Sequence, residues 1–296
     1  MAGLRLDQAL QKLLPEYSRS RLQEWIKQEW ISVDGKSAIT KQPVWGGENV
    51  AVAPQASPAE TAYIPQDIAL DIIYEDAAIL VVDKPAGLVV HPGSGNWQGT
   101  LLNALLHHAP QLAEVPRAGI VHRLDKDTSG LLVVAKTLTA QTDLVRQLQA
   151  RSVKREYRAV VQGCVARDGT VDAPLGRHPV QRTKMAIVSS GKPAVTHYHV
   201  LERYPAHTLV ECRLETGRTH QIRVHMLSIG HPLAGDQAYG GKPANLPADV
   251  RVAIKQLGRQ ALHAARLGLI HPVSHEFMEW HSAVPADMVT LIEGLR

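Results

Sequence analysis

Only two cysteines, Cys164 and Cys212, occur in the 296-residue chain, and they lie far apart in the sequence. A disulfide framework and a cysteine-based zinc site are therefore excluded, so the fold must be stabilised by packing. No apolar run approaches the ~18 residues that a membrane span requires, and the N-terminus has no apolar signal core. We expect a cytoplasmic protein that does not associate with membranes.

Aromatic residues are also scarce, with one Phe, five Trp and seven Tyr. This scarcity argues against a broad aromatic platform on which nucleic-acid bases stack, so any base stacking must use one or two rings. The net charge of +4 is too small to indicate nucleic-acid binding by itself, but its distribution is uneven. Residues 115–160 hold nine basic and four acidic residues, and residues 176–195 hold four basic and no acidic ones.

The first sixty residues have the pattern of a small separate domain. Apolar residues at helical spacing predict a helix over residues 6–14, and Ser18 or Ser20 can cap a second helix. Residues 30–33 alternate like a strand and precede an Asp-Gly turn, and valines at 44, 50 and 52 suggest returning strands. Residues 54–60 contain two prolines without periodicity, which is typical of a linker. We therefore place one domain at residues 1–60 and a second at residues 61–296.

In the second domain the predicted strands and helices do not alternate regularly. Strands are expected over residues 79–83, 131–135, 157–162, 194–201, 208–215 and 278–281, and helices over residues 101–108 and 139–149. Irregular order and short connections favour an α+β fold with a largely antiparallel mixed sheet flanked by helices and loops.

Residues 119–130 (GIVHRLDKDTSG) place charged residues and turn formers between two apolar segments. An ordinary polar turn is the simplest interpretation. A calcium loop fails because its twelfth position is Lys136, where a bidentate Glu is needed, and Ser129 lacks the elbow motif of a hydrolase nucleophile.

A second polar segment, residues 214–225 (LETGRTHQIRVH), carries Arg218 and Arg223 after a turn. Its two histidines, His220 and His225, are five residues apart and so lack the spacing of the zinc-binding helix motif, which argues against metal catalysis. Arg223 on its own could equally be a solvated surface charge. An Arg beside Asp125 would keep that carboxylate ionised and oriented, as a nucleophile requires.

Five motifs in the same order resemble those of the RluA family of RNA pseudouridine synthases. They are residues 83–92 (DKPAGLVVHP), 122–130 (HRLDKDTSG), 154–157 (KREY), 217–225 (GRTHQIRVH) and 260–264 (QALHA). The first sixty residues resemble the small α/β RNA-binding domain named after ribosomal protein S-four, through residues 4–7 (LRLD) and 18–21 (SRSR). Residues 115–121 and 191–198 look closest to the RluD branch, which modifies large-subunit ribosomal RNA. The resemblance covers nearly the whole chain.

The resemblance implies an isomerase that needs no cofactor or metal. Asp125 would be the catalytic carboxylate, Arg223 its ion-pair partner, and Tyr157 a ring that stacks on the flipped-out uridine and takes the carbon 5 proton. Whether Asp125 attacks the sugar or first deprotonates it stays open, and Tyr157 judged alone could be a packing residue. Arg123 is the expected wedge, a side chain that inserts into the RNA stack where the uridine leaves it. The other expected RNA contacts are His122, Arg218, Arg19, Arg21 and the basic segment with Arg177, Arg182 and Lys184.

The expected partner is large-subunit ribosomal RNA or a pre-ribosomal particle, bound by a monomer. A catalytically silent RNA-binding or ribosome-assembly protein is an alternative, but it leaves the co-occurrence of Asp125, Tyr157 and Arg223 unexplained. A synthase acting on other ribosomal or transfer RNA uridines is another.

Overall fold

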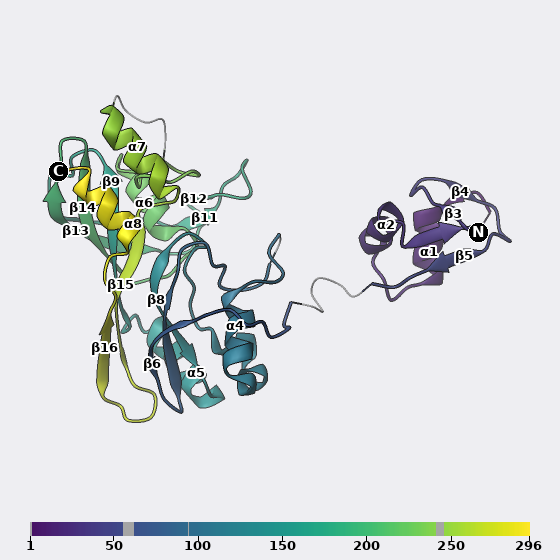
Figure 1. Cartoon of the computed structure of the whole chain (residues 1–296), viewed down its shortest axis with the longest axis horizontal. Helices are drawn as coiled ribbons and strands as arrows, with labels where there is room; N and C mark the ends of the chain where they lie inside the picture. The colour runs from purple at the N-terminus through teal and green to yellow at the C-terminus, as the bar shows by residue number, and fades with distance from the viewer. Residues whose placement is uncertain (1, 56–61, 94, 241–245) are drawn as a thin grey trace. The chain divides into compact units, whose positions relative to one another are not determined.

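The computed structural model describes residues 2–55, 62–93, 95–240 and 246–296. The chain divides into two compact units, Met1–Thr61 and Ala62–Arg296 (Figure 1). Most of the predicted linker, residues 56–60, lies outside the described residues.

The first unit contains two short helices and several short strands, as predicted. Helices α1 (Leu6–Leu13) and α2 (Arg19–Lys27) pack their apolar faces on β2 (Ile31–Val33) and β4 (Pro43–Val44), and the Ser18 side chain caps α2 by accepting the Arg21 amide. β2 pairs with β3 (Lys36–Ser37) and β5 (Val50–Val52), while β1 (Leu4–Arg5) pairs with β4. All members of this core come from the first unit.

The second unit is built on a nine-stranded sheet in the order β10-β13-β14-β9-β15-β8-β7-β6, with β16 paired to β15. Only the pair of β15 and β8 is parallel, so the predicted α+β fold with a largely antiparallel mixed sheet is confirmed. The strands are β6 (Asp71–Glu75), β7 (Ile79–Lys84), β8 (Ser129–Ala135), β9 (Lys154–Gln162), β10 (Gly169–Asp172), β13 (Val195–Arg203), β14 (His207–Leu214), β15 (Leu262–Ile270) and β16 (Phe277–His281).

The central strands β7 and β8 are buried on both faces, which explains their continuous apolar sequences. Along β7, Leu80 and Val82 join the core that includes α4 (Leu101–His108), whereas Ile79 and Val81 join the core that includes α5 (Leu138–Gln149). This division follows from the alternation of side chains along a strand. The two helices therefore cover opposite faces of the same strands.

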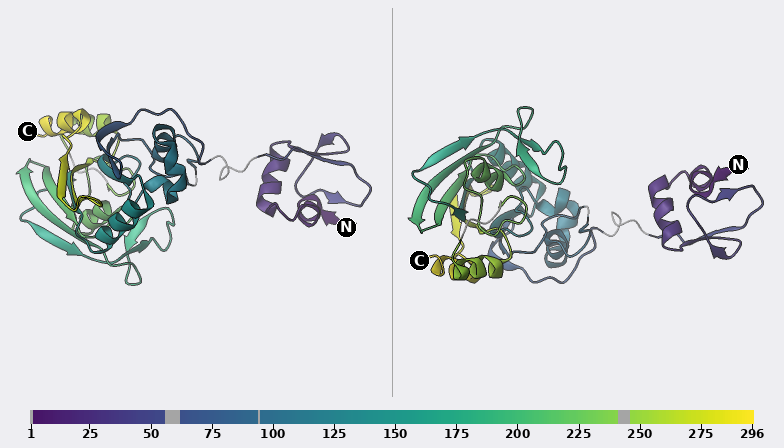
Figure 2. Two further views of the ribbon diagram at one scale, coloured as in Figure 1. Left: turned by 90° about the horizontal axis from the view of Figure 1, so that it is seen from below. Right: turned by 90° about the horizontal axis from the view of Figure 1, so that it is seen from above.

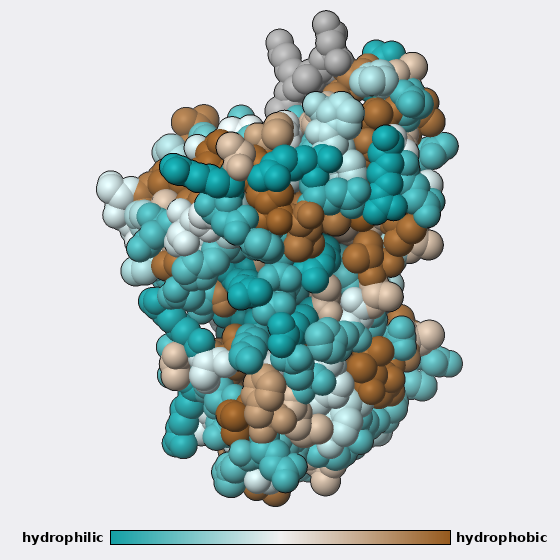
Figure 3. Space-filling model, turned by 90° about the vertical axis from the view of Figure 1, so that its left-hand side faces the viewer, coloured by the Kyte–Doolittle hydropathy of each residue, from teal (hydrophilic) through white to brown (hydrophobic). Residues whose placement is uncertain are grey.

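The remaining elements pack against this sheet and its connecting loops (Figure 2). They are the short helices η1 (Pro110–Glu114) and η2 (Pro116–Gly119), the hairpin of β11 (Leu175–Arg177) and β12 (Met185–Ile187), and the helices α6 (Gln221–Ser228), α7 (Ala248–Leu257) and α8 (Ala286–Glu293). Sequence analysis did not predict β15 or α6. On the face shown in Figure 3, hydrophobic residues are interspersed with hydrophilic ones. No helix in the described part of the chain is both long and apolar enough to cross a membrane.

Candidate active site

Asp125 lies in the loop that connects η2 to β8. The loop is closed by a turn in which the Thr128 amide donates to the Asp125 carbonyl oxygen at 3.1 Å. Its end is anchored by Gly130, where an added Cβ would lie 2.3 Å from the carbonyl oxygen of Ala264 on the parallel strand β15. Glycine is therefore required at the point where β8 meets β15, and this close approach fixes the end of the Asp125 loop.

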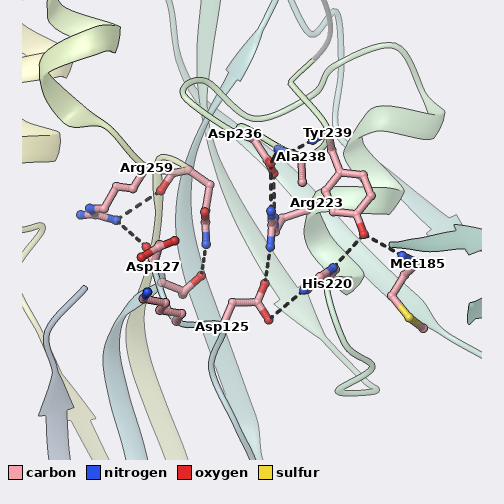
Figure 4. A network of polar contacts seen from close by, with 12 residues as sticks. Asp125, Asp127, Met185, His220, Arg223, Asp236, Ala238, Tyr239 and Arg259 are labelled. Carbon is pink, nitrogen blue, oxygen red and sulfur yellow. Dashed lines mark hydrogen bonds and ion pairs between the residues drawn. The ribbon is translucent and has the colours of Figure 1, made fainter. Parts of the chain in front are cut away.

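Arg223 on α6 connects Asp125 to a buried second carboxylate (Figure 4). Its Nη1 donates to Asp125 Oδ2 at 3.0 Å, while Nε and Nη2 donate to the two oxygens of Asp236 at 2.7 and 2.9 Å. The side chain of Asp236 is fully buried, and it also accepts the amides of Ala238 and Tyr239. The guanidinium is thus held in one orientation with its free edge aimed at Asp125.

Electrostatics keep the pair of Arg223 and Asp236 charged despite their burial. Burial by itself would raise the pKa of Asp236, but the hydrogen bonds and charge of Arg223 hold that pKa below its usual value. Burial would likewise lower the pKa of Arg223, yet the carboxylates of Asp236 and Asp125 raise it. A permanent positive charge therefore lies beside one oxygen of Asp125.

The other side of Asp125 faces a histidine. His220 Nε2 lies 4.0 Å from Asp125 Oδ1, and His220 Nδ1 is 2.7 Å from the hydroxyl of Tyr239. The same hydroxyl accepts the amide of Met185, the first residue of β12, at 2.8 Å. The Tyr239 ring also covers the guanidinium of Arg223, 4.9 Å from the ring centroid.

Tyr157 lies on β9, between Cys212 of β14 and Ala264 of β15. It is buried, and burial raises the pKa of its hydroxyl above the usual value. Tyr157, Asp125 and Arg223 line one small cavity. The structure therefore brings together the three residues predicted to be catalytic, although they come from three different elements.

Lys84, the last residue of β7, bonds to the backbone of the loop that carries Asp125. Its Nζ donates to the carbonyl oxygens of Pro85, Leu88 and Lys126 at 2.8 to 3.0 Å, and the side chain is 1% exposed. Burial lowers the pKa of Lys84 to about 7, against the attraction of Asp127 and Asp125. Lys84 thus fixes the backbone next to Asp125.

A cleft of about 1100 Å³ opens above these residues. Of the predicted RNA contacts, Arg123 and Arg218 line it and are exposed. The basic segment forms the β11–β12 hairpin, where Arg177 and Arg182 are exposed and Lys184 Nζ lies 5.8 Å from the centroid of the Tyr239 ring. The hairpin therefore adjoins the site through Tyr239.

The remaining predicted RNA contacts are engaged within the protein. His122 also lines the cleft, but its Nε2 accepts the amide of Val133, and burial followed by the charge of Arg155 lowers its pKa to about 3. In the first unit, Arg19 pairs with the buried Asp7 at 2.8 Å. Arg21 lies over the rings of Tyr17 and Trp25, 5.0 Å from each centroid. Contacts of these residues with RNA stay predictions.

Sequence analysis missed Asp236, Tyr239 and Lys84 as parts of the site, and it treated His220 only as a possible metal ligand or part of a motif. Asp236 and Tyr239 belong to residues 234–240 (AGDQAYG), a polar turn after a short apolar run. That composition was the only available signal, and it is common to many turns.

Comparison with known proteins supports the resemblance of the motifs. Residues 78–228 match the sequence profile of the family described as RNA pseudouridylate synthase. A ribosomal large subunit pseudouridine synthase D from Nitrosomonas europaea is 60% identical, over 100% of this chain and 86% of that protein. A protein of the same name from Neisseria meningitidis serogroup B is 56% identical, over 100% of this chain and 80% of its own.

A solved structure extends the similarity to the fold. Human RNA Pseudouridylate Synthase Domain Containing 4 has a TM-score of 0.60 and 26% sequence identity, covering 76% of this chain and 92% of that one.

Proposed function

Because the chain belongs to the RNA pseudouridylate synthase family, as its motifs predicted, we propose that it converts specific uridines of large-subunit ribosomal RNA to pseudouridine. The names of the relatives at 60% and 56% identity support this substrate. In this proposal the enzyme acts as a monomer in the cytoplasm, on ribosomal RNA or a pre-ribosomal particle.

The reaction breaks the bond between C1′ of the ribose and N1 of uracil, and forms a bond between C1′ and C5. A proton leaves C5 and one is gained at N1, so atoms balance without a cofactor. The enzyme must therefore stabilise an electron-poor sugar while the base turns, hold the base in place, and move the C5 proton.

Asp125 is the residue that we assign to the sugar. A carboxylate at the floor of a cleft can attack C1′ or take a proton from the ribose, as carboxylates of glycosidases act at an anomeric centre. The observation that carries the assignment is the contact of Arg223 with Asp125 Oδ2, because it orients the carboxylate within the cavity that Asp125, Arg223 and Tyr157 line. Side-chain exposure of 14% leaves Asp125 accessible to a flipped-out nucleotide.

Tyr157 is the residue that we assign to the base. Its ring lines the cavity beside Asp125, where it can stack on the turned uracil, and its hydroxyl can take the C5 proton. Burial that raises its pKa keeps the phenol protonated at neutral pH. When the hydroxyl takes the C5 proton it must therefore release its own proton, and the proton gained at N1 of the base balances that release.

Basic side chains in both units are assigned to the RNA backbone, where each neutralised phosphate contributes salt-dependent affinity. They are Arg218, Arg177, Arg182 and Lys184 in the second unit, together with Arg19 and Arg21 in the first unit. Arg123 is assigned instead as the wedge that helps to hold the target uridine out of the RNA stack. We propose that the first unit is an RNA-binding domain that adds affinity or selectivity rather than chemistry.

The test is the substitution Asp125→Asn, assayed in single turnover on large-subunit ribosomal RNA. We expect no pseudouridine to form, while RNA affinity stays within a few-fold of wild type because the amide keeps the size of the side chain. A wild-type protein that binds this RNA but forms no pseudouridine would instead support the silent RNA-binding alternative. An active Asn variant would remove Asp125 from the mechanism.

A further inference from the structure

His220 has a backbone conformation that is uncommon for a residue other than glycine. It precedes α6 with φ of 56° and ψ of 22°, in the left-handed region. Such conformations persist where the surroundings fix them, and they are frequent at functional sites. Here the conformation directs the imidazole between Asp125 and Tyr239 (Figure 4).

The contacts of Tyr239 favour one position of the proton on the imidazole of His220. The Tyr239 hydroxyl oxygen accepts the amide of Met185, so its hydrogen is available to donate to His220 Nδ1 at 2.7 Å. A neutral imidazole that accepts at Nδ1 carries its hydrogen on Nε2. Burial lowers the pKa of His220, which agrees with a neutral ring at pH 7.

The Nε2 atom of His220 points at the oxygen of Asp125 that Arg223 does not contact. Arg223 donates to Oδ2 at 3.0 Å, and His220 Nε2 lies 4.0 Å from Oδ1. The second distance is longer than a hydrogen bond, but contacts of this kind often shorten when substrate binds. Two donors, one on each oxygen, would fix the plane of the carboxylate as well as its position.

We propose that His220 is a positioning residue for Asp125, held by Tyr239 as the neutral Nε2–H tautomer so that it donates to Asp125 Oδ1 in the substrate complex. This inference rests on the proposed function, because it assigns His220 a role in the step that Asp125 performs. In this proposal the amide of Met185 orients the Tyr239 hydroxyl, and that hydroxyl sets the tautomer of His220.

The first test separates positioning from RNA binding. His220→Leu removes the donor and should lower the single-turnover rate at saturating large-subunit ribosomal RNA by about 100-fold, the typical effect of misplacing a reacting group by about 1 Å. RNA affinity should stay within a few-fold. His220→Gln keeps an N–H donor and should restore most of the rate. His231→Gln is the matched control, because His231 is also half-buried but bonds to the carbonyl of Gln162, and its rate should equal that of wild type.

The second test observes the tautomer directly and needs no activity. In protein labelled with ¹⁵N-histidine, the His220 signals, assigned by their absence in His220→Gln, should show a protonated Nε2 and an unprotonated Nδ1. Tyr239→Phe keeps the ring over Arg223 but removes the hydroxyl, so the His220 signals should shift toward a mixture of tautomers.

Several results would overturn the inference. A loss of affinity with a normal rate at saturation would make His220 an RNA contact, and equal rates for the Leu variant and wild type would leave it without a role in chemistry. A protonated Nδ1 in wild type would contradict the tautomer. If wild type forms no pseudouridine on this RNA, the proposed function fails and the inference fails with it, whereas an active wild type with an unaffected Leu variant rejects the inference alone.

Discussion

Asp236 offers a sharp test of how the site is held together, because its carboxylate is fully buried and bonds to Arg223 through both oxygens. In Asp236→Asn, the amide oxygen can take the place of Oδ1 and keep the bonds from Arg223 Nη2 and the amides of Ala238 and Tyr239. The amide nitrogen must then face Arg223 Nε, 2.7 Å from the present Oδ2, with a donor against a donor.

The expected loss of stability follows from that geometry. The charge-assisted hydrogen bond from Arg223 Nε disappears. The buried guanidinium of Arg223 then has Asp125 as its remaining charged partner among the contacts described above. Breaking a buried ion pair from one side typically costs about 3 kcal/mol or more, and we expect about 3 kcal/mol here because Asp125 still compensates part of the charge. Because the bond from Nε is lost, the guanidinium should also change its orientation, so the single-turnover rate should fall by about 100-fold with RNA affinity unchanged.

Asp287 provides a matched control. It contacts Arg259 with the same bidentate geometry, at 2.7 and 2.9 Å, but its side chain is 41% exposed. Arg259 is itself 7% exposed, but it also donates to the backbone carbonyls of Asp127, Gln260 and Leu262. Because water can reach the Asp287 side of the pair, Asp287→Asn should cost about 1 kcal/mol, clearly less than Asp236→Asn. Urea denaturation gives the free energy of unfolding of both variants, and circular dichroism verifies that the assayed Asp236→Asn protein is folded. Equal stability losses in the two variants, or a normal rate in folded Asp236→Asn, would refute the reasoning.

Three further predictions concern the base, the loop and the first unit. Tyr157→Phe should keep RNA affinity but lower the single-turnover rate by ~10² to 10⁴, and a normal rate would mean that Tyr157 only stacks. Because burial lowers the pKa of Lys84 from 10.5 to about 7, the unfolded chain binds more protons between these pH values. The free energy of unfolding of wild type relative to Lys84→Met should therefore rise with pH across that window, by at most ~1.4 kcal/mol per unit, and a flat difference would contradict the shifted pKa. A chain of residues 62–296 should unfold cooperatively, because its apolar cores contain no residue of the first unit. This fragment should keep the isomerase activity but bind RNA more weakly. A folded fragment without activity at saturating RNA would show that the first unit is needed for chemistry.

Much of the fold was predictable because its signals are local. The strand at β8 and the helix α4 were predicted from their apolar runs, and the helices of the first unit from their spacing. β15 was missed although it occupies a central position in the sheet. Its sequence, residues 262–270 (LHAARLGLI), has no clear alternation because it is buried on both faces beside β9 and β8, and only the neighbouring strands reveal that environment.

The sequence by itself determined the family, through motifs whose order identifies the chain, and it singled out Asp125, Tyr157 and Arg223 as a set. Only the tertiary structure decided that Asp236 orients Arg223, that Lys84 fixes the Asp125 loop, and that Tyr239 connects the β11–β12 hairpin to His220. Short-range patterns specify helices, strands and turns, because the side chains involved are neighbours along the chain. The orientation of a buried charged group depends on partners that are distant in sequence, such as Arg223 and Asp125 at a separation of 98 residues, and these partners meet only when the sheet and α6 have packed.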